Sequence, residues 1–179
     1  MNKELVEVIA EIVATTATEI LPILQEADGN IQTLHYEHGH YAEIHQTLKD
    51  FSESPTLYTQ KYPLVAVIED IMGRAVKDDT EYRFTIIIAH STKDDIKSQK
   101  RYDDVIKPIL RVIYEALKRN IMDSGYFYGY TLKHDPIIHP YYGSQDRKDA
   151  NVFSDFLDCI EMRTVTLKMY PQDTCAWTI

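Results

Sequence analysis

The chain of 179 residues has few cysteines and glycines, the residues on which disulfide-rich folds and phosphate-binding loops depend. It contains two cysteines, Cys159 and Cys175, one tryptophan and six glycines. Two cysteines are too few for a disulfide framework, so we expect a protein that folds in a reducing, cytoplasmic setting. The glycines are scattered singly, which excludes a phosphate loop and a dinucleotide-binding fingerprint.

The sequence also lacks a long apolar run and an excess of basic charge. No run approaches the roughly 20 apolar residues that a membrane-spanning helix requires. Glu4, Glu7 and Glu11 interrupt the apolar N-terminal residues and argue against a signal peptide. The formal net charge of −9 disfavours a protein whose main task is to grip phosphates. It leaves open a surface past which DNA slides without sticking.

The strongest structural pattern lies in residues 82–121. A strand at 82–89 has one apolar face, made of Tyr82, Phe84, Ile86 and Ile88. Its other face is only half polar, so we expect a central strand with two antiparallel neighbours. A helix follows to residue 121, and its apolar stripe contains Tyr102, Ile106, Ile109, Leu110, Ile113, Leu117 and Ile121. A sheet covered by this helix is the smallest core that buries both patterns.

The other expected elements are helices at 2–21 and 41–51 and strands at 31–37, 62–71 and 155–169. Asn2 is the expected N-cap of the first helix, and Pro22 should end or kink it. The charged residues 73–80 predict a hairpin loop. In the last strand the inward positions slip by one residue, which predicts a β-bulge near residues 163–164.

These elements predict an α+β fold in a single domain, 1–179, with a mostly antiparallel sheet, helices packed on one face, and extended loops or arms. Residues 1–55 form its N-terminal helical part, and residues 60–170 form the sheet-and-helix core. Residues 123–150 are dense in aromatic residues, glycine and proline, so we expect a long functional connection or a short hairpin there. The chain has 13 tyrosines, which suit either a protein interface or the edge of the core.

A cluster of four histidines raises the question of a metal site. Strand alternation would send His35 and His38 to opposite faces, and Gly39 then reverses the chain. His40 and His45 are five positions apart, which is not the step that stacks two ligands on a helix. We therefore favour turn and surface histidines over a zinc site.

The sequence gives even less support to the other possible catalytic groups. Asp95-Ile96-Lys97, with Asp70 upstream, has the layout of one nuclease class, but this short match is common by chance and falls in a polar loop. Cys159 lies in an expected strand without a cationic neighbour in sequence. Ser124 lacks the flanking glycine of a nucleophile elbow, and residues 146–149 are expected to be a solvated turn. We expect no catalytic residue, metal or cofactor, and keep a metal-dependent hydrolase or nuclease as the alternative.

Several segments together resemble a known group of proteins. They are Lys61-Tyr62-Pro63-Leu64-Val65, Ala89-His90-Ser91-Thr92, Gln99-Lys100-Arg101-Tyr102, Ile106-Lys107-Pro108-Ile109-Leu110, Ile113-Tyr114 and the stretch from Asn151 to Glu161. In this order and spacing the chain, over about residues 60–170, resembles head–tail joining or tail-completion proteins of tailed phages and prophages.

The resemblance implies a structural protein of the virion neck or tail end, assembled in the cytoplasm of the bacterial host, and not an enzyme. Many copies would form a ring that joins or seals portal and tail, with portal, neck or tail-tube proteins as partners. DNA would pass through the lumen without specific binding, and a net acidic channel wall would repel it. The expected contact residues are Tyr126, Tyr128, Tyr130, Tyr141 and Tyr142 in the aromatic segment and Pro55 in the loop at 52–60.

Overall fold

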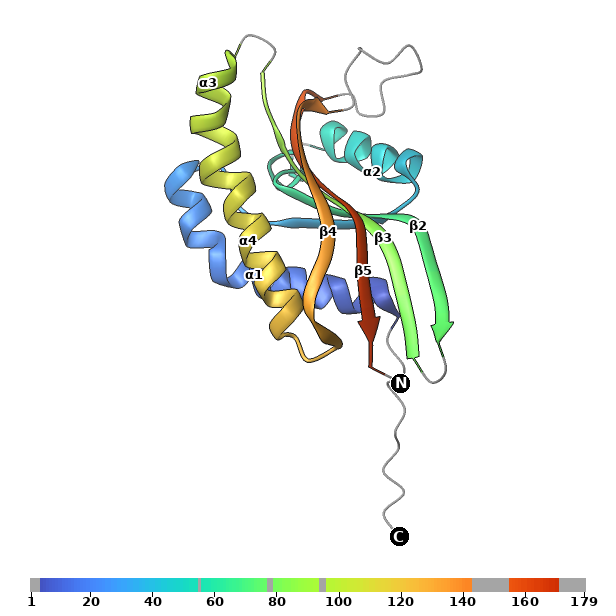
Figure 1. The fold of residues 1–179 in the computed structure, drawn as a ribbon. Coiled ribbons are helices and arrows are strands. Elements are labelled where there is room, and N and C mark those ends of the chain that lie inside the picture. The colour runs from blue at the N-terminus through green and yellow to red at the C-terminus, as the bar shows by residue number, and fades with distance from the viewer. Residues whose placement is uncertain (1–3, 55, 77–78, 94–95, 143–154, 171–179) are drawn as a thin grey trace.

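The computed structural model describes residues 4–54, 56–76, 79–93, 96–142 and 155–170. In Figure 1 a single curled sheet is covered by helices. The sheet has five strands in the order β1-β2-β3-β5-β4. The elements are α1 Leu5–Ala27, β1 His35–Gly39, α2 Tyr41–Glu53, η1 Tyr58–Gln60, β2 Leu64–Val76, β3 Asp79–Ser91, α3 Ser98–Arg101, η2 Tyr102–Leu110, α4 Arg111–Asp123, β4 Phe127–Tyr142 and β5 Leu157–Met169.

β3 is the central strand, and both of its neighbours are antiparallel. β4 also runs antiparallel to β5, whereas β1 runs parallel to β2. The α+β class and the mostly antiparallel sheet are therefore confirmed. The hairpin loop predicted at 73–80 is wrong in extent, because β2 and β3 stay paired as far as Val76 and Asp79. Charged residues occur in solvent-exposed strands as well as in loops. The composition of residues 73–80 therefore does not distinguish a strand from a loop.

The larger core lies between one face of the sheet and the helices α1, η2 and α4. Alternate residues of β2, β3 and β5 supply its sheet side, among them Val67, Ile86 and Met162. From the helices, Ile9, Ile113 and Leu117 are fully buried against them or nearly so. The apolar stripe predicted for residues 102–121 thus covers the predicted central strand.

A smaller core lies on the opposite face, under α2. Ile44 and Leu48 of α2 pack with Ala66, Ile87 and Cys159 of the sheet. The placement of helices on one face holds for α1 and α4, but α2 covers the reverse side. This second core explains why the reverse face of β3 is only half polar in sequence: α2 buries the apolar half.

Two prolines lie within helices. Pro22 is inside α1, which continues to Ala27, and Figure 1 shows that α1 changes direction along its length. Pro22 therefore does not end the helix, and a proline kink accounts for the bend. Pro108 lies in the π-helical segment η2, where the N–H of Arg111 donates to the carbonyl of Ile106. Such wide turns relieve the clash between a proline ring and the preceding turn.

The predicted bulge in β5 is confirmed. Phe84 pairs with Val165 and Ile86 pairs with Met162, so β5 has one residue more than β3 between the two pairs. Thr164 takes up the extra length with φ of 53°. The inward positions therefore move from Met162 to Val165, as the slip in the sequence required.

This backbone conformation gives a stability prediction. A non-glycine residue with positive φ carries about 1–2 kcal/mol of strain, which glycine relieves at some cost in unfolded-state entropy. We expect Thr164→Gly to raise the free energy of unfolding by about 0.5–1 kcal/mol, measured by urea denaturation. Thr166→Gly, in the same strand, is the matched control and should lower it by about 1 kcal/mol. Destabilisation by both changes would contradict the strain at Thr164.

The described part of the aromatic segment is mainly one long strand, and is neither the long connection nor the short hairpin that the sequence predicts. β4 spans Phe127–Tyr142 and lies at one edge of the sheet, paired with β5. Its prolines, Pro136 and Pro140, are tolerated because an edge strand does not need every backbone donor. Residues 143–150 lie outside the described residues. Among the described helices, none combines the length and apolar character needed to cross a membrane.

Candidate functional site

A cleft opens at the end of the sheet where β3 finishes and β5 begins. Its volume is about 810 Å³. The C-terminal end of α1, residues 58–62, the end of β3, η2 and residues 155–156 all contribute to its wall. We call it the polar cleft, because its lining brings Asp28, Lys61, His90 and Asp155 together with the exposed rings of Tyr58 and Phe156.

Lys61 is almost completely buried at the base of this cleft, with 2% of its surface exposed. Its ammonium group donates to the carboxylate of Asp155 and to Ser52 Oγ. The hydroxyl of Tyr62 donates to the same carboxylate at 2.8 Å. Burial, followed by the charge of Asp155, raises the pKa of the Tyr62 phenol. The lysine charge is thereby neutralised in place, and Tyr62 stays protonated.

His90 lies beside this pair, at the end of β3, and is only 7% exposed. Burial lowers the pKa of its imidazole to about 4, although Asp28 opposes the shift. Asp28 Oδ2 lies 3.9 Å from His90 Nε2, and the ring of Tyr62 meets the imidazole edge-on at 6.5 Å. His90 is therefore uncharged at neutral pH.

A second buried ion pair lies next to the cleft. Arg101 Nε is 3.2 Å from Asp158 Oδ2, and the side chains are 3% and 0% exposed. Arg101 also donates to the carbonyl of Ile96 at 3.0 Å, and its guanidinium lies 3.6 Å from the centre of the Tyr141 ring. Burial raises the pKa of the Asp158 carboxyl, and Arg101 partly opposes this. The pair ties the first turn of α3 to the start of β5 and the end of β4.

These ion pairs mainly fasten chain segments to one another. Lys61 and Arg101 are each engaged with a carboxylate, so neither is an uncommitted cation for an anionic substrate. Across the described ranges, no three His, Cys, Asp or Glu side chains are grouped so that they could hold a metal ion. These contacts join the chain segments at this end of the sheet.

The structure disperses the predicted histidine cluster. His35 Nε2 lies 3.0 Å from Glu37 Oε1, and the ring of His38 stacks on Tyr36. His40 is the N-cap of α2, where its Nδ1 accepts from the N–H of Ala42. His45 lies within α2.

The remaining catalytic alternatives are placed as follows. Cys159 is buried, and burial raises the pKa of its thiol, so it is not a reactive thiolate. Ser124 Oγ donates to the carbonyl of Ile121 at the end of α4. Asp95, residues 146–149 and the side chain of Asp70 lie outside the described residues.

The predicted contact tyrosines lie at the two ends of β4 and are half-buried. At one end the hydroxyl of Tyr126 donates to Glu11 at 2.8 Å, and the ring of Tyr128 lies 4.8 Å from that of Tyr170. At the other end Tyr141 stacks on Arg101, as described above. There the hydroxyl of Tyr142 lies 3.1 Å from that of Tyr41. The side chain of Tyr130 and all of Pro55 lie outside the described residues. A contact with another protein remains a prediction.

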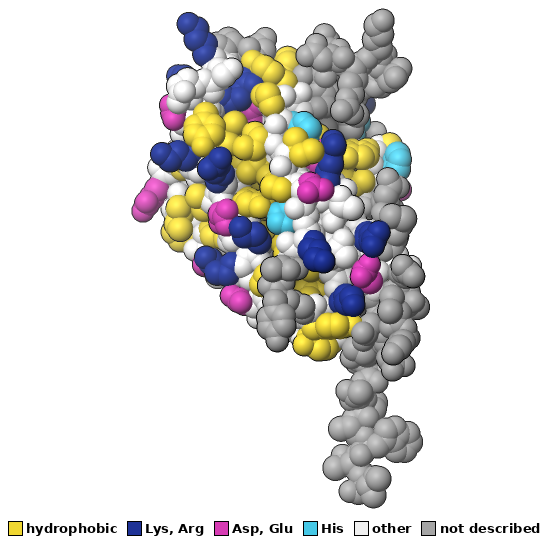
Figure 2. Space-filling view, in the orientation of Figure 1, with side chains coloured by type: hydrophobic (Ala, Val, Ile, Leu, Met, Phe, Trp, Pro, Cys, Tyr) yellow, Lys and Arg dark blue, Asp and Glu magenta, His cyan; other side chains and the backbone are white. Residues whose placement is uncertain are grey.

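Sequence reasoning missed a group of cations on the reverse face of the sheet, beyond α2. We call Arg83, Lys133, Arg163 and Lys168 the basic sheet face. Register brings them together, because Thr166 pairs with both Arg83 and Lys133. Figure 2 shows Lys and Arg side chains spread over β4 and β5 on this side. Alternation places each of these residues on one face of its own strand. Only the pairing of β4 with β5 shows that they all lie on the same face of the sheet.

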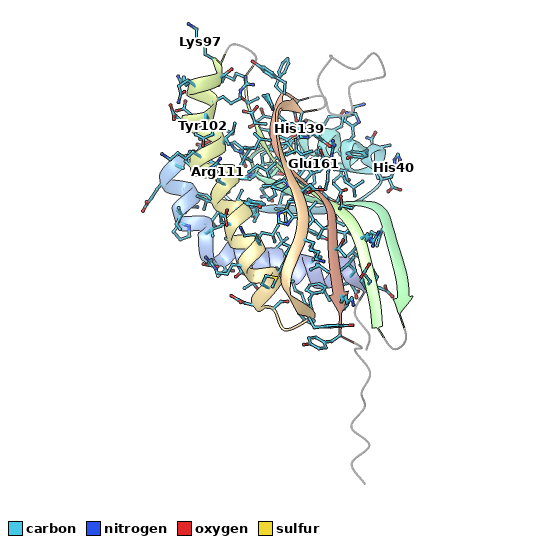
Figure 3. All side chains as sticks on the ribbon, in the orientation of Figure 1. His40, Lys97, Tyr102, Arg111, His139 and Glu161 are labelled. Carbon is cyan, nitrogen blue, oxygen red and sulfur yellow. The ribbon has the colours of Figure 1, made fainter. Side chains whose placement is uncertain are left out.

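Glu161 also belongs to this face and is only 6% exposed. His139 Nε2 lies 2.7 Å from its Oε2, and Arg163 Nε donates to the same oxygen at 2.9 Å. Figure 3 shows His139 and Glu161 close together on neighbouring strands. The carboxylate is thus held by two partners within its own sheet.

No family model matches the chain, and no curated protein matches it either.

Proposed function

We propose that this protein is a non-enzymatic structural component of a tailed-phage virion. Copies of it form a ring at the neck or tail end, which joins or seals the capsid portal and the tail. Its partners are further copies of the chain and the portal, neck or tail-tube proteins of the same virion. DNA passes through the lumen of the ring without specific binding.

The observation that carries this proposal is the position of the aromatic segment. That segment, chosen from the sequence as the contact region, is the edge strand β4 of a sheet whose interior is packed on both faces. A rigid sheet whose edge strand carries half-buried tyrosines and the exposed side chain of Ile138 is a suitable scaffold for contacts between subunits. Pro136 and Pro140 remove backbone donors from this edge, so its contacts rely on side chains and not on added strands.

The charge of the chain also supports the proposal. A net charge of −9 lets a ring of many copies surround DNA without gripping it. The alternative of a metal-dependent hydrolase or nuclease is favoured by no observation on the described residues.

The first experiment measures the assembly of the full chain. We expect size-exclusion chromatography with light scattering to give one oligomer, and electron microscopy to show closed rings. Ile138→Asp on β4, where the side chain is 40% exposed, should weaken the oligomer, because the change puts a charge into an apolar contact. Ile23→Asp on α1 is the matched control, with a side chain 51% exposed.

The second experiment removes the gene from the phage or prophage that encodes it. Heads and tails should then accumulate separately, and the gene supplied from a plasmid should restore joined particles. A protein that stays monomeric at high concentration and binds neither portal nor tail-tube protein would contradict the proposal.

A further inference from the structure

The polar cleft has an electronegative side, formed by the C-terminal end of α1. This helix of 23 residues ends at Ala27, which lines the cleft, and its last turn contains no basic residue. The carbonyl groups at the C-terminal end of a helix together act as about half a negative charge. Asp28 follows directly and also lines the cleft, so a full carboxylate charge is added at the same place.

The Asp28 carboxylate is paired with no lysine or arginine among the described residues, and its side chain is 34% exposed. Its Oδ1 accepts from the backbone N–H and the side-chain amide of Asn30, at 2.9 and 2.8 Å, but both donors are uncharged. Its Oδ2 is nearest to His90, which is uncharged at neutral pH. Asp104, a second carboxylate of the lining, is different because it lies 4.0 Å from Lys100.

His90 supplies a second polar group of the same wall. The side chain is 7% exposed, and its Nδ1 is buried without a hydrogen-bond partner among the described residues. Its Nε2 lies 3.9 Å from Asp28 Oδ2, which is too long for a direct hydrogen bond. One donor nitrogen placed between these two atoms lies about 2.8–3.0 Å from each. The separation therefore fits a nitrogen that donates to the carboxylate and to the imidazole together.

The rest of the lining suits an apolar ligand body. It contains four aliphatic side chains, Ile31, Ile96, Val105 and Ile109. It also contains Tyr58 and Phe156, whose side chains are 62% and 43% exposed. Aromatic rings contact apolar groups and attract cations through their faces. The volume of about 810 Å³ is within the range of small-molecule sites.

Other classes of ligand fit this cleft less well. An anion meets the unpaired charge of Asp28, while Lys61 is neutralised by Asp155 and the exposed ammonium of Lys93 is screened by water. Calcium and magnesium require about six oxygen ligands. As noted above, the described ranges contain no group of three side chains suited to hold a metal ion.

We propose that the polar cleft binds a small organic ammonium ion. The nitrogen of the ligand lies between Asp28 and His90 and donates a hydrogen bond to Oδ2 of the first and to Nε2 of the second. Its apolar body packs against the aliphatic wall and the rings of Tyr58 and Phe156. The ammonium group matches this position because it has several donors, no acceptor and a positive charge. This site is separate from the subunit contacts of the proposed ring, so each is tested without the other.

Isothermal titration calorimetry of the full chain with three phenyl compounds of similar size tests the class of ligand. At neutral pH 2-phenylethylamine is an ammonium ion, 2-phenylethanol is uncharged and 3-phenylpropionate is an anion. We expect saturable binding of the amine, with a dissociation constant of about 1 mM or lower. The alcohol should bind about tenfold more weakly, because a charge-assisted hydrogen bond is roughly twice as strong as a neutral one. The anion should not bind.

Two matched variants test the assigned carboxylate. Asp28→Asn keeps the size of the side chain and an acceptor for Asn30 but removes the charge. It should weaken amine binding by about tenfold and leave the alcohol unchanged. Asp50→Asn, exposed on α2 and bonded to Gln46, makes the same change in net charge away from the cleft and should bind the amine like the wild type.

A third variant and a spectroscopic measurement test the other contacts. Phe156→Ala should weaken the amine and the alcohol equally, because both lose the same apolar surface. In the wild type, the ¹⁵N NMR signal of His90 Nε2 should shift on addition of the amine and not of the anion. This measurement needs no substitution, so it remains valid if a cleft variant fails to fold.

Three results would overturn the inference. The first is the absence of saturable amine binding up to about 20 mM, which is well above the expected dissociation constant. The second is equal affinity of the wild type for the amine and the alcohol. The third is a folded Asp28→Asn variant that binds the amine as tightly as the wild type does. None of them bears on the ring, which is judged by the oligomer and by the joined particles.

Discussion

Asp158→Ala lowers the free energy of unfolding by about 3–5 kcal/mol, because it leaves the buried guanidinium of Arg101 without its carboxylate. Arg101 is 3% exposed and Asp158 is not exposed at all, so water cannot replace the lost partner. The ring of Tyr141 and the carbonyl of Ile96 stay in contact with Arg101, but neither neutralises its charge. Urea denaturation monitored by circular dichroism measures the change.

Two control variants separate this effect from simple loss of a side chain. Asp104→Ala removes the partner of Lys100, which lies 4.0 Å away in a pair whose side chains are 51% and 71% exposed. That change should alter stability by less than about 1 kcal/mol. Adding Arg101→Met to Asp158→Ala removes the unpaired charge and should recover more than half of the loss. No recovery in the double variant would show that packing, and not the buried charge, causes the destabilisation.

The protein loses stability as the pH falls from about 6.5 to about 4, because His90 is held uncharged in the folded state. Its pKa is lowered from an ordinary value of 6.5 to about 4. Between these values the unfolded chain binds a proton at this histidine and the folded chain does not, so acidification favours unfolding. The difference corresponds to about 2–3 kcal/mol between pH 7 and about pH 4.5.

The measurement compares the wild type with His90→Gln by denaturation at both pH values. Carboxylates that are paired in the folded state also titrate in acid, so the difference between the two proteins is the quantity that isolates His90. The wild type should lose about 2–3 kcal/mol more than the variant over this range. An NMR titration in which the His90 ring protonates near pH 6.5 in the folded protein would contradict the assignment.

Both effects arise at the same end of the molecule as the polar cleft. Lys61 with Asp155, and Arg101 with Asp158, join residues that are far apart in sequence; the first two are 94 positions apart. They hold the segments before β2, at the end of α3 and at the start of β5 in fixed positions relative to one another. The stability of the protein is therefore sensitive to the loss of a buried charge partner at this end of the sheet.

Local periodicity was enough to predict the central strand, the stripe of the long helix and the bulge in β5. Each of these depends on residues a few positions apart, which the backbone places on one face whatever surrounds them. The slip of inward positions between Met162 and Val165 is such a signal, and Thr164 carries the extra residue. The extent of β4 was missed, since Pro136 and Pro140 exclude a central strand but not an edge strand.

The sequence by itself determined the α+β class, the central position of β3 and the elements that bury the larger core. Only the tertiary structure decided that α2 covers the reverse face, that His90 is buried beside Lys61 and Asp155, and that four cations share one sheet face. The reason is register. The pairing and alignment of the strands decide which residues, distant in the sequence, lie next to each other on one face of the sheet. No pattern within a single segment contains that information.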